Sequence, residues 1–398
     1  MVRTWDIFCS VIDNYGDIGV CWRLARQLAT GPARSVRLWV DDLASFHRLC
    51  HGVDADLAVQ RVAGVEIRRW DASFPEAAPA EIVVEGFGVR LPDSYLQAMA
   101  RQSPPPAWIN LEYLSAEDWI ETCHRLPSPH PQLPLIRHFF FPGFTGATGG
   151  LLIEPGLAAA RDAFQRDRAA NSAFWKSIGI AEPAEPAEPA EPVLRVSLFC
   201  YANAALSSLV DAWTRGSGRI LCVVPEGDAA AALAGLLGRP LPPGARAGRG
   251  RLAIAVIPFL EQDAYDRLLW ACDLNLVRGE DSFVRAQLAA RPLVWQAYPQ
   301  EERAHLLKAS AFLQRYLDGA PPSTQLAAAA FSEAWNRQSP DCGRHWESLL
   351  PQLPALAAHA KAWAGALARG PSLAETLAHF CEDRLKYQVI HSTLQDES

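Results

Sequence analysis

Strand-like and helix-like segments alternate along most of this chain, and that alternation restricts its fold more than any other feature of the sequence. The pattern begins with an apolar strand over 5–12, a helix over 16–30 and a second strand over 35–40. Further strands are predicted at 65–70, 82–84, 107–111, 136–141, 193–199, 220–224, 252–259, 274–277 and 292–296. Alternation of this kind produces βαβ units and parallel sheets. We therefore predict an α/β protein.

The second half repeats the alternation before the chain becomes helical only. Helices are predicted at 205–215, 228–237, 262–271 and 282–290. From about residue 301 onward only helical patterns follow, ending with an amphipathic helix over 372–386. In doubly wound sheets, ligands bind beyond the carboxyl ends of the strands, so loops that follow strands are the candidate sites.

A tripeptide repeat, Ala-Glu-Pro, occupies residues 181–192. Proline at every third position removes N–H donors and prevents a regular helix, which predicts an extended, solvated linker. We therefore expect a first Rossmann-like domain over 1–180 and a second over 193–370. Residues 371–398 form a C-terminal helix and tail, for which packing against the first domain is one possibility.

The composition excludes several classes of protein. A formal charge of −7 argues against a nucleic-acid partner, because such proteins usually carry a basic face. The nine cysteines are odd in number and contain no C-x-x-C pair, which favours free thiols in a reducing cytoplasm over disulfides or a zinc site. No apolar run reaches the roughly 18 residues that suggest a membrane span. We expect a cytoplasmic protein without a membrane partner.

The first candidate site follows the first predicted strand. Two carboxylates, Asp13 and Asp17, stand four residues apart in Asp13-Asn-Tyr-Gly-Asp-Ile-Gly19. Glycine in such a turn lets the backbone approach a ligand closely, and Asn14, Tyr15 and Gly16 are candidates for contact with an acceptor. Ordinary helix capping is the alternative role for either aspartate.

The second candidate site lies between the strand at 274–277 and the next helix. Ser282 is the predicted N-cap, so the N–H groups of Ser282, Phe283 and Val284 would bind an anion such as a diphosphate. Arg285 would assist, whereas Glu280 and Asp281 could hold sugar hydroxyls. Plain capping is again the alternative.

Aromatic residues at strand ends predict a nucleobase site in the second half. Phe199 and Tyr201 end one strand, and Phe259 ends another, followed by Gln262 and Tyr265. Rings hold a base by stacking, and an amide adds directional hydrogen bonds. Each ring taken alone is better explained as a core residue, and the shared position of the rings at strand ends is what favours a site.

A fourth segment, Glu112 with Tyr113, follows a strand of the first half and could line the acceptor side, although loop packing explains it as well. Asp54-Ala-Asp56 has no apolar strand before it, so we predict no metal site there.

Three of these segments together resemble the EarP family. They are Asp13 to Leu24, Asn110 to Glu117 and Arg278 to Gln287. The family transfers rhamnose from TDP-β-L-rhamnose to one arginine of elongation factor P. The resemblance implies a GT-B fold, with two Rossmann-like domains facing across a cleft, and an inverting reaction without metal or other cofactor.

The resemblance also implies roles for individual residues. Asp13, Asp17 and Glu280 match the essential acids of the family. The donor-nucleotide pocket is matched by Phe199, Tyr201, Phe259, Gln262, Tyr265, Asp281 and Ser282. At Tyr265 the family commonly has phenylalanine, so a hydroxyl is added here.

An arginine side chain stays protonated to a pKa above about 12 and is a poor nucleophile. Carboxylates can grip the guanidinium, aim one nitrogen at the sugar and accept its proton as the bond forms. We expect Asp17 to be the base and Asp13 to orient the guanidinium. Glu280 shares in the orientation, and an exchange of roles between Asp17 and Glu280 stays open.

Two alternatives remain at the level of sequence. One is a glycosyltransferase with a different donor or a small-molecule or lipid acceptor, and the other is a non-catalytic protein that binds a sugar nucleotide. A protein that only binds a sugar nucleotide would not require two acids in the first half. Consumption of the donor in the presence of an acceptor would separate these alternatives.

Overall fold

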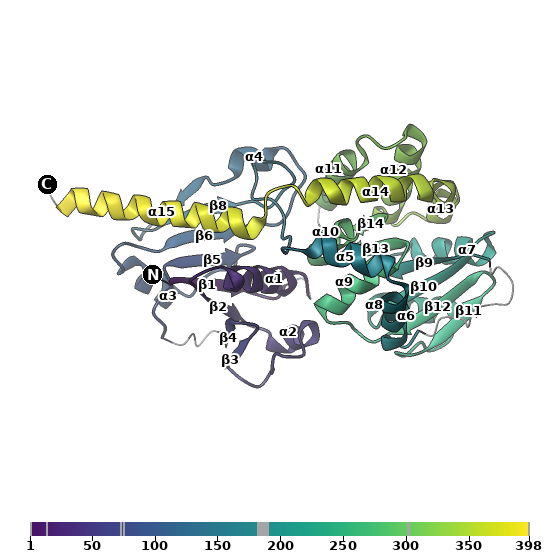
Figure 1. The fold of residues 1–398 in the computed structure, drawn as a ribbon, viewed down its shortest axis with the longest axis horizontal. Coiled ribbons are helices and arrows are strands. Elements are labelled where there is room, and N and C mark those ends of the chain that lie inside the picture. Colours follow the sequence, from purple (N-terminus) through teal and green to yellow (C-terminus); the bar gives the residue numbers. More distant parts are fainter. Residues whose placement is uncertain are drawn as a thin grey trace. The chain divides into compact units, whose positions relative to one another are not determined.

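The computed structural model describes residues 2–12, 15–71, 74, 76–180, 191–300 and 303–396, with only the backbone of 388–396. The chain forms two compact units (Figure 1). Unit 1 comprises Met1–Pro155 and Gly370–Ser398, and unit 2 comprises Gly156–Arg369.

Unit 1 is built on a sheet of eight strands in the order β3-β4-β2-β1-β5-β6-β8-β7. The strands are β1 (Arg3–Cys9), β2 (Arg34–Val40), β3 (Val59–Val62), β4 (Val65–Arg69), β5 (Ile82–Gly86), β6 (Ala107–Leu111), β7 (Pro127–Pro129) and β8 (Ile136–Phe140). The edge strands β3 and β7 pair antiparallel, and the other pairings are parallel. The helices of this unit are α1 (Gly16–Thr30), α2 (Leu43–Leu49), α3 (Asp93–Ala100), α4 (Trp119–Cys123) and α15 (Leu373–Asp396).

Unit 2 has a sheet of six strands in the order β11-β12-β10-β9-β13-β14, in which only β11 pairs antiparallel. The strands are β9 (Val193–Leu198), β10 (Arg219–Pro225), β11 (Arg246–Arg249), β12 (Leu252–Ile257), β13 (Leu274–Arg278) and β14 (Leu293–Gln296). Its α-helices are α5 (Leu157–Arg166), α6 (Arg168–Ser177), α7 (Leu206–Arg215), α8 (Asp228–Leu237), α9 (Gln262–Ala271), α10 (Asp281–Leu288), α11 (Ala304–Leu317), α12 (Pro322–Asn336), α13 (Cys342–Leu349) and α14 (Leu353–Leu367).

Both sheets have the strand order of a doubly wound Rossmann fold. In each sheet the chain builds outward from its first strand in one direction and then returns to build in the other. The point of reversal lies between two paired strands, which are β1 and β5 in unit 1 and β9 and β13 in unit 2. Loops leave these neighbouring strands in opposite directions, which opens a crevice beyond their carboxyl ends where ligands bind.

Many predicted elements are reproduced closely. The helices over 16–30, 228–237 and 262–271 and the strand over 107–111 have the predicted bounds. The first strand was predicted over 5–12 but ends at Cys9. The apolar run of the sequence continues to residue 12, but the strand ends earlier because residues 10–12 leave the sheet and hydrogen-bond with the side chains of Asp41 and Asp17.

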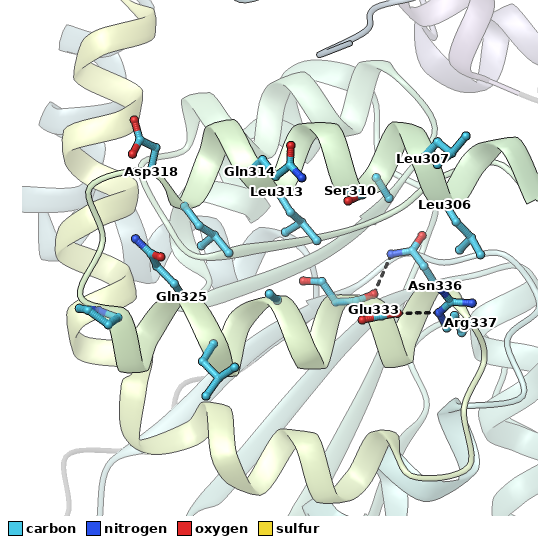
Figure 2. A pocket seen from close by; sticks show the side chains of 16 residues that line it. Leu306, Leu307, Ser310, Leu313, Gln314, Asp318, Gln325, Glu333, Asn336 and Arg337 are labelled. Carbon is cyan, nitrogen blue, oxygen red and sulfur yellow. Dashed lines mark hydrogen bonds and ion pairs between the residues drawn. The ribbon is translucent and has the colours of Figure 1, made fainter. Parts of the chain in front are cut away.

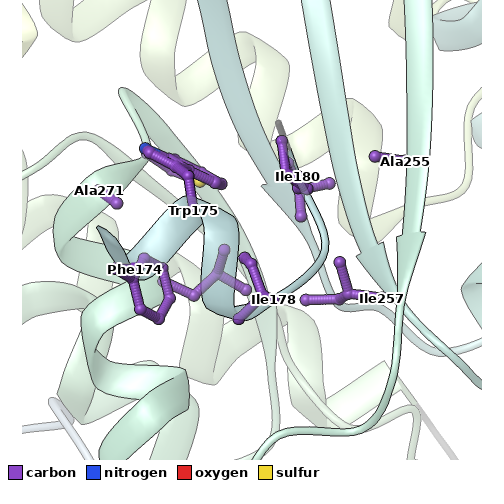
Figure 3. Close-up of a cluster of buried hydrophobic side chains, with 10 residues drawn as sticks. Phe174, Trp175, Ile178, Ile180, Ala255, Ile257 and Ala271 are labelled. Atoms are coloured by element: carbon purple, nitrogen blue, oxygen red, sulfur yellow. The ribbon is translucent and has the colours of Figure 1, made fainter. Parts of the chain in front are cut away.

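The boundary between the units lies at Pro155–Gly156, not at the Ala-Glu-Pro repeat where the sequence predicted it. Residues 181–190 of that repeat lie outside the described residues. Helix α6 and the turn after it bring Phe174, Trp175, Ile178 and Ile180 into the core of unit 2 (Figure 3). There they pack against strand and helix residues that include Val223, Ala255, Ile257 and Leu268. Burial of this apolar surface assigns α5 and α6 to unit 2.

The C-terminal helix α15 belongs to unit 1, which is the packing that the sequence left as a possibility. The N–H of Leu373 donates to the carbonyl of Leu151 at 2.8 Å, and the hydroxyl of Thr376 donates to the carbonyl of Gly149 at 2.5 Å. At Gly150 (φ +79°) a Cβ would lie 2.1 Å from the Pro371 carbonyl oxygen. Only glycine allows this approach of the two segments.

All nine cysteines are free, and seven of them are buried. Among the described residues, no helix is both long and apolar enough to cross a membrane.

Replacement of Trp175 by alanine tests the assignment of α6 to the core of unit 2. The side chain is 1% exposed and its indole N–H donates to Asn171 Oδ1 at 2.8 Å. We expect a loss of about 3–5 kcal/mol in the free energy of unfolding, because a large cavity and an unpaired amide remain. Urea denaturation followed by circular dichroism measures it. Leu326→Ala, at a side chain 75% exposed, is the control and should change little. A cost for Trp175→Ala as small as that of the control would contradict the assignment.

Candidate active site

The loop after β1 is fixed by two carboxylates. Asp41, which follows β2, accepts hydrogen bonds from the Ser10 hydroxyl at 2.5 Å and the Val11 N–H at 2.9 Å. Asp17, in the first turn of α1, accepts from the Ile12 N–H at 3.0 Å. Adjacent parallel strands end at the same edge, so Asp41 reaches this loop directly. Sequence reasoning missed Asp41, because its role is visible only once β2 is paired with β1.

Of the other candidate residues of the first motif, the structure describes Tyr15 and Gly16. Asp13 and Asn14 lie outside the described residues, so their predicted roles stay predictions. Tyr15 is the N-cap residue of α1, and the Arg48 guanidinium lies 5.7 Å from the centre of its ring. Gly16 is the first residue of the helix, as the motif predicted.

Asp17 and Tyr113 are brought together from segments almost a hundred residues apart. The Tyr113 hydroxyl donates to Asp17 Oδ1 at 3.1 Å. Asp17 is 1% exposed, whereas Tyr113 is 37% exposed. A buried carboxylate that accepts a backbone N–H and a phenol is held in one orientation, which a base acting on a positioned substrate requires.

Glu112 is part of a polar network at the end of β6. Its Oε1 accepts a hydrogen bond from Asn110 Nδ2 at 2.6 Å, and its own N–H donates to the Phe140 carbonyl. Beside Asn110 in the sheet lies Glu85, which is 2% exposed and pairs with Arg137 at 3.0 Å. Burial raises the pKa of Glu85 to about 7, although Arg137 lowers it. The polar network at the end of β6 thus lies beside a buried acid that the sequence did not single out.

In unit 2 the most informative side chain is Arg278, the last residue of β13. Its guanidinium carbon lies 4.6 Å from the centre of the Phe199 ring and 4.4 Å from that of Tyr201. The residue is 8% exposed, and Nη1 has no hydrogen-bond partner among the described residues. Asp228 Oδ2 lies 4.0 Å from Nη1, which is beyond hydrogen-bond distance. A buried guanidinium nitrogen without a hydrogen bond is suited to a phosphate group.

The start of α10 differs from the prediction by two residues. Glu280, not Ser282, is the N-cap, and the helix begins at Asp281. The N–H of Val284 is occupied because it donates to the Glu280 carbonyl at 3.0 Å. In the first turn of a helix the N–H groups have no acceptor within the helix, and those of Ser282 and Phe283 are in this position. The Ser282 hydroxyl donates back to the Arg278 carbonyl, which ties the end of β13 to the helix.

Arg285 does not have the geometry of a phosphate-binding helper. Its Nη2 lies 2.6 Å from Asp266 Oδ2, its Nε lies 3.1 Å from Oδ1, and the residue is 3% exposed. This bidentate ion pair connects α10 to α9 within unit 2. Sequence proximity to the motif suggested a role at the ligand, whereas the helical rotation directs the side chain to α9.

The predicted base-binding residues gather around α9. The Gln262 side-chain amide donates to Asp281 Oδ2 at 3.1 Å, which links the first turns of α9 and α10. Tyr265 lies edge-on to Phe199 with ring centres 5.7 Å apart. Its hydroxyl oxygen is buried and has no partner among the described residues. Phe259 is half-buried in the turn between β12 and α9.

Phe283 has a different role from its neighbours. Its ring is 2% exposed and stacks on Trp295 at 4.1 Å, so the side chain belongs to the core and only its N–H is available for a ligand site. Tyr298 was missed by the sequence analysis. It is 51% exposed and lies edge-on to Tyr201 at 5.3 Å, after the end of β14.

A groove of about 770 Å³ between α11 and α12 contains none of the predicted site residues (Figure 2). Leucines from both helices, including Leu307, Leu313 and Leu326, line it. Within the described part of the chain, no group of three His, Cys, Asp or Glu side chains is arranged to hold a metal ion.

Comparison with solved structures defines the class of this protein. A structure described as the structural basis for EarP-mediated arginine glycosylation of translation elongation factor EF-P aligns with a TM-score of 0.68 at 35% identity, covering 96% of this chain and 99% of that one. MurG of Acinetobacter baumannii aligns with a TM-score of 0.51 at 12% identity, covering 96% and 100%, which bears on the fold alone. The two Rossmann-like units and the similarity to the EarP structure place the chain in the GT-B class of glycosyltransferases.

The chain belongs to the EarP family. The family model described as Elongation-Factor P (EF-P) rhamnosyltransferase EarP matches residues 5–382. A protein-arginine rhamnosyltransferase of Pseudomonas putida is 46% identical over 386 residues, covering 97% of this chain and all of that protein. One of Neisseria meningitidis serogroup B is 33% identical over 398 residues, covering 96% and 97%. The predicted fold and family are thereby confirmed.

The pairing of Arg285 with Asp266 predicts a purely structural effect of mutation. Asp266→Ala should lower the free energy of unfolding by about 3–5 kcal/mol, because it leaves a buried guanidinium unpaired. The double variant Asp266→Leu with Arg285→Met should recover most of that loss, because it removes both charges and retains volume. Chemical denaturation measures both. If instead Arg285→Met has normal stability but fails to bind a nucleoside diphosphate, the result would support the predicted phosphate-binding role of Arg285.

Proposed function

We propose that this protein transfers rhamnose from TDP-β-L-rhamnose to an arginine side chain of translation elongation factor P, with inversion at the sugar carbon. The observation that carries the proposal is the carboxylate of Asp17, oriented at the switch point of unit 1. This carboxylate stands in a chain that matches protein-arginine rhamnosyltransferases along nearly its whole length. A translation factor as the acceptor also accounts for the expected cytoplasmic location.

In this proposal unit 1 receives the acceptor arginine. Asp17 binds the guanidinium, aims one nitrogen at C1 of the sugar and accepts the proton as the new bond forms. Because a guanidinium remains protonated at neutral pH, proton loss must accompany bond formation, not precede it. Tyr113 and the Ile12 N–H keep the carboxylate in place. Asp13 orients the guanidinium, and Glu280, the N-cap of α10, shares in orienting acceptor or sugar, or takes the role of the base.

The bond changes are those of a single displacement. The arginine nitrogen bonds to C1 as the bond from C1 to the diphosphate oxygen breaks, and TDP leaves with the electron pair. The arginine proton goes to the base. Attack from the side opposite the leaving group inverts the configuration, so β-linked rhamnose in the donor becomes α-linked in the product.

Unit 2 holds the donor in this proposal. Arg278 and the N–H groups at the start of α10 stabilise the diphosphate and its developing charge without a metal or another cofactor. Nη1 of Arg278, which has no hydrogen-bond partner among the described residues, supports this role. Phe199, Tyr201, Phe259 and Tyr265 provide aromatic surface for the base and sugar, and Gln262 adds hydrogen bonds. Asp281 and Ser282 belong to the same pocket.

Intact-mass spectrometry of purified elongation factor P tests the proposal. Incubation with this protein, TDP-β-L-rhamnose and a chelator should add one deoxyhexose, which peptide sequencing should locate on a single arginine. Asp17→Asn should reduce transfer by at least about 100-fold, since a general base is lost, while calorimetry shows unchanged donor binding. No added mass with folded wild-type protein and intact donor would refute this donor and acceptor. Lost donor binding in Asp17→Asn would place Asp17 in the donor pocket.

Arg278→Gln should weaken donor binding. Loss of a charged hydrogen-bond donor should raise KM for the sugar nucleotide roughly 10- to 100-fold and leave KM for the acceptor protein unchanged. Arg215→Gln is the matched control, because it removes the same charge from a side chain that is 74% exposed and pairs with Asp211 on the same helix. An equal KM for the donor in both variants would exclude Arg278 from the diphosphate site.

A further inference from the structure

Phe87 stands at the switch point of unit 1, although no part of the sequence analysis pointed to it. It is the first residue after β5, the strand that lies beside β1 on the other side of the reversal. The loops after these two strands border the crevice in which a doubly wound sheet binds ligands. Ile12 and Asp17, which follow β1 on one border, are already placed in the candidate site, and Phe87 begins the other border.

The backbone of Phe87 is in a conformation that a phenylalanine rarely adopts. Its φ of +59° lies in the left-handed region, and the following Gly88 has φ +71°. The Val89 N–H donates to the Gly86 carbonyl at 3.3 Å and closes the turn. Two further hydrogen bonds tie it to the end of β6: the Phe87 N–H donates to the Leu111 carbonyl at 2.7 Å, and the Gly88 N–H donates to Asn110 Oδ1 at 3.0 Å. Strained backbone of this kind persists where the surrounding structure imposes it, and it concentrates at functional sites.

This turn places the Phe87 ring against the ring that contacts Asp17. Phe87 and Tyr113 stack with ring centres 4.4 Å apart and an angle of 18° between their planes. The Tyr113 hydroxyl donates to Asp17 Oδ1 at 3.1 Å. Phe87 is half-buried and Tyr113 is 37% exposed, so the stacked pair retains aromatic surface beside the carboxylate. The first turn of α1 and the loops after β5 and β6 thus contribute one side chain each.

An aromatic face beside a carboxylate matches the chemistry of a guanidinium. The planar guanidinium is weakly hydrated, so it stacks on an aromatic ring while its edge donates hydrogen bonds to a carboxylate. A lysine ammonium is compact and strongly hydrated, and it gains less from a flat apolar surface. The same surroundings therefore favour arginine over lysine.

We propose that Phe87, together with Tyr113, forms an aromatic platform that binds the acceptor guanidinium and selects arginine over lysine. The inference rests on the proposed function. Phe87 determines specificity by direct contact with the guanidinium. Its left-handed backbone keeps the ring parallel to that of Tyr113.

The test compares Phe87→Leu with wild-type protein, using elongation factor P and its variant with lysine at the modified arginine. KM for the arginine acceptor should rise about tenfold in Phe87→Leu, the size of a partly desolvated cation–π contact. The Kd of the lysine variant and KM for the donor should stay the same, so the preference for arginine should fall by the same factor. Phe380→Leu, at a half-buried ring on α15, is the matched control and should leave all three constants unchanged.

Phe87→Gly provides a second variant that does not depend on a bulky residue tolerating positive φ. It should lose the preference for arginine at least as strongly as Phe87→Leu. An unchanged ratio of arginine to lysine affinity in folded, active variants would overturn the platform and leave the proposed function intact. Absence of transfer to any arginine acceptor by wild-type protein would instead refute the proposed function, and the platform with it.

Discussion

Parallel pairing of β1 with β5, and of β9 with β13, is the constraint on which both candidate sites depend. Each pairing joins the strand that starts its sheet to the strand added after the chain reverses. The carboxyl ends of the two strands meet at one edge, and their loops separate from each other. In unit 1 this brings the loop around Asp17 close to the turn at Phe87. In unit 2 it brings Phe199 and Tyr201 under the guanidinium of Arg278.

Arg278 and Arg285 illustrate how position within an element decides the use of a charge. Both belong to one motif of ten residues, and both are buried. Arg285 lies one turn into α10, where rotation of the helix directs it to Asp266. Its charge is neutralised within the protein and stabilises the packing of two helices. Arg278 ends a strand, lies over two rings and has an Nη1 without a hydrogen-bond partner among the described residues. Only the second arrangement leaves binding capacity for an anion.

Local patterns were sufficient for most elements and for some of their ends, but not for all of them. Helix α1 begins at Gly16 as its motif indicated, because the glycine turn and the apolar period are both local. The start of α10 was misplaced because Ser282, a favourable capping residue, uses its hydroxyl on the carbonyl of Arg278. The domain boundary was misplaced because the linker composition of the repeat decides the boundary less than the burial of apolar side chains before it does. Trp175 and its neighbours bury apolar area in unit 2, and this area assigns the segment before the linker to that unit.

The sequence by itself determined the α/β class, the family and the residues of its motifs, since these depend on apolar periodicity and on local residue types. The tertiary structure decided which of those residues meet. The hydrogen bond between Tyr113 and Asp17 joins positions 96 residues apart, and Asp41 reaches the loop after β1 only through the pairing of β2. Phe87 carries no local signal, because its left-handed backbone is imposed by hydrogen bonds to Leu111 and Asn110 on the neighbouring strand. Contacts of this kind arise from strand order and register, which no local pattern encodes.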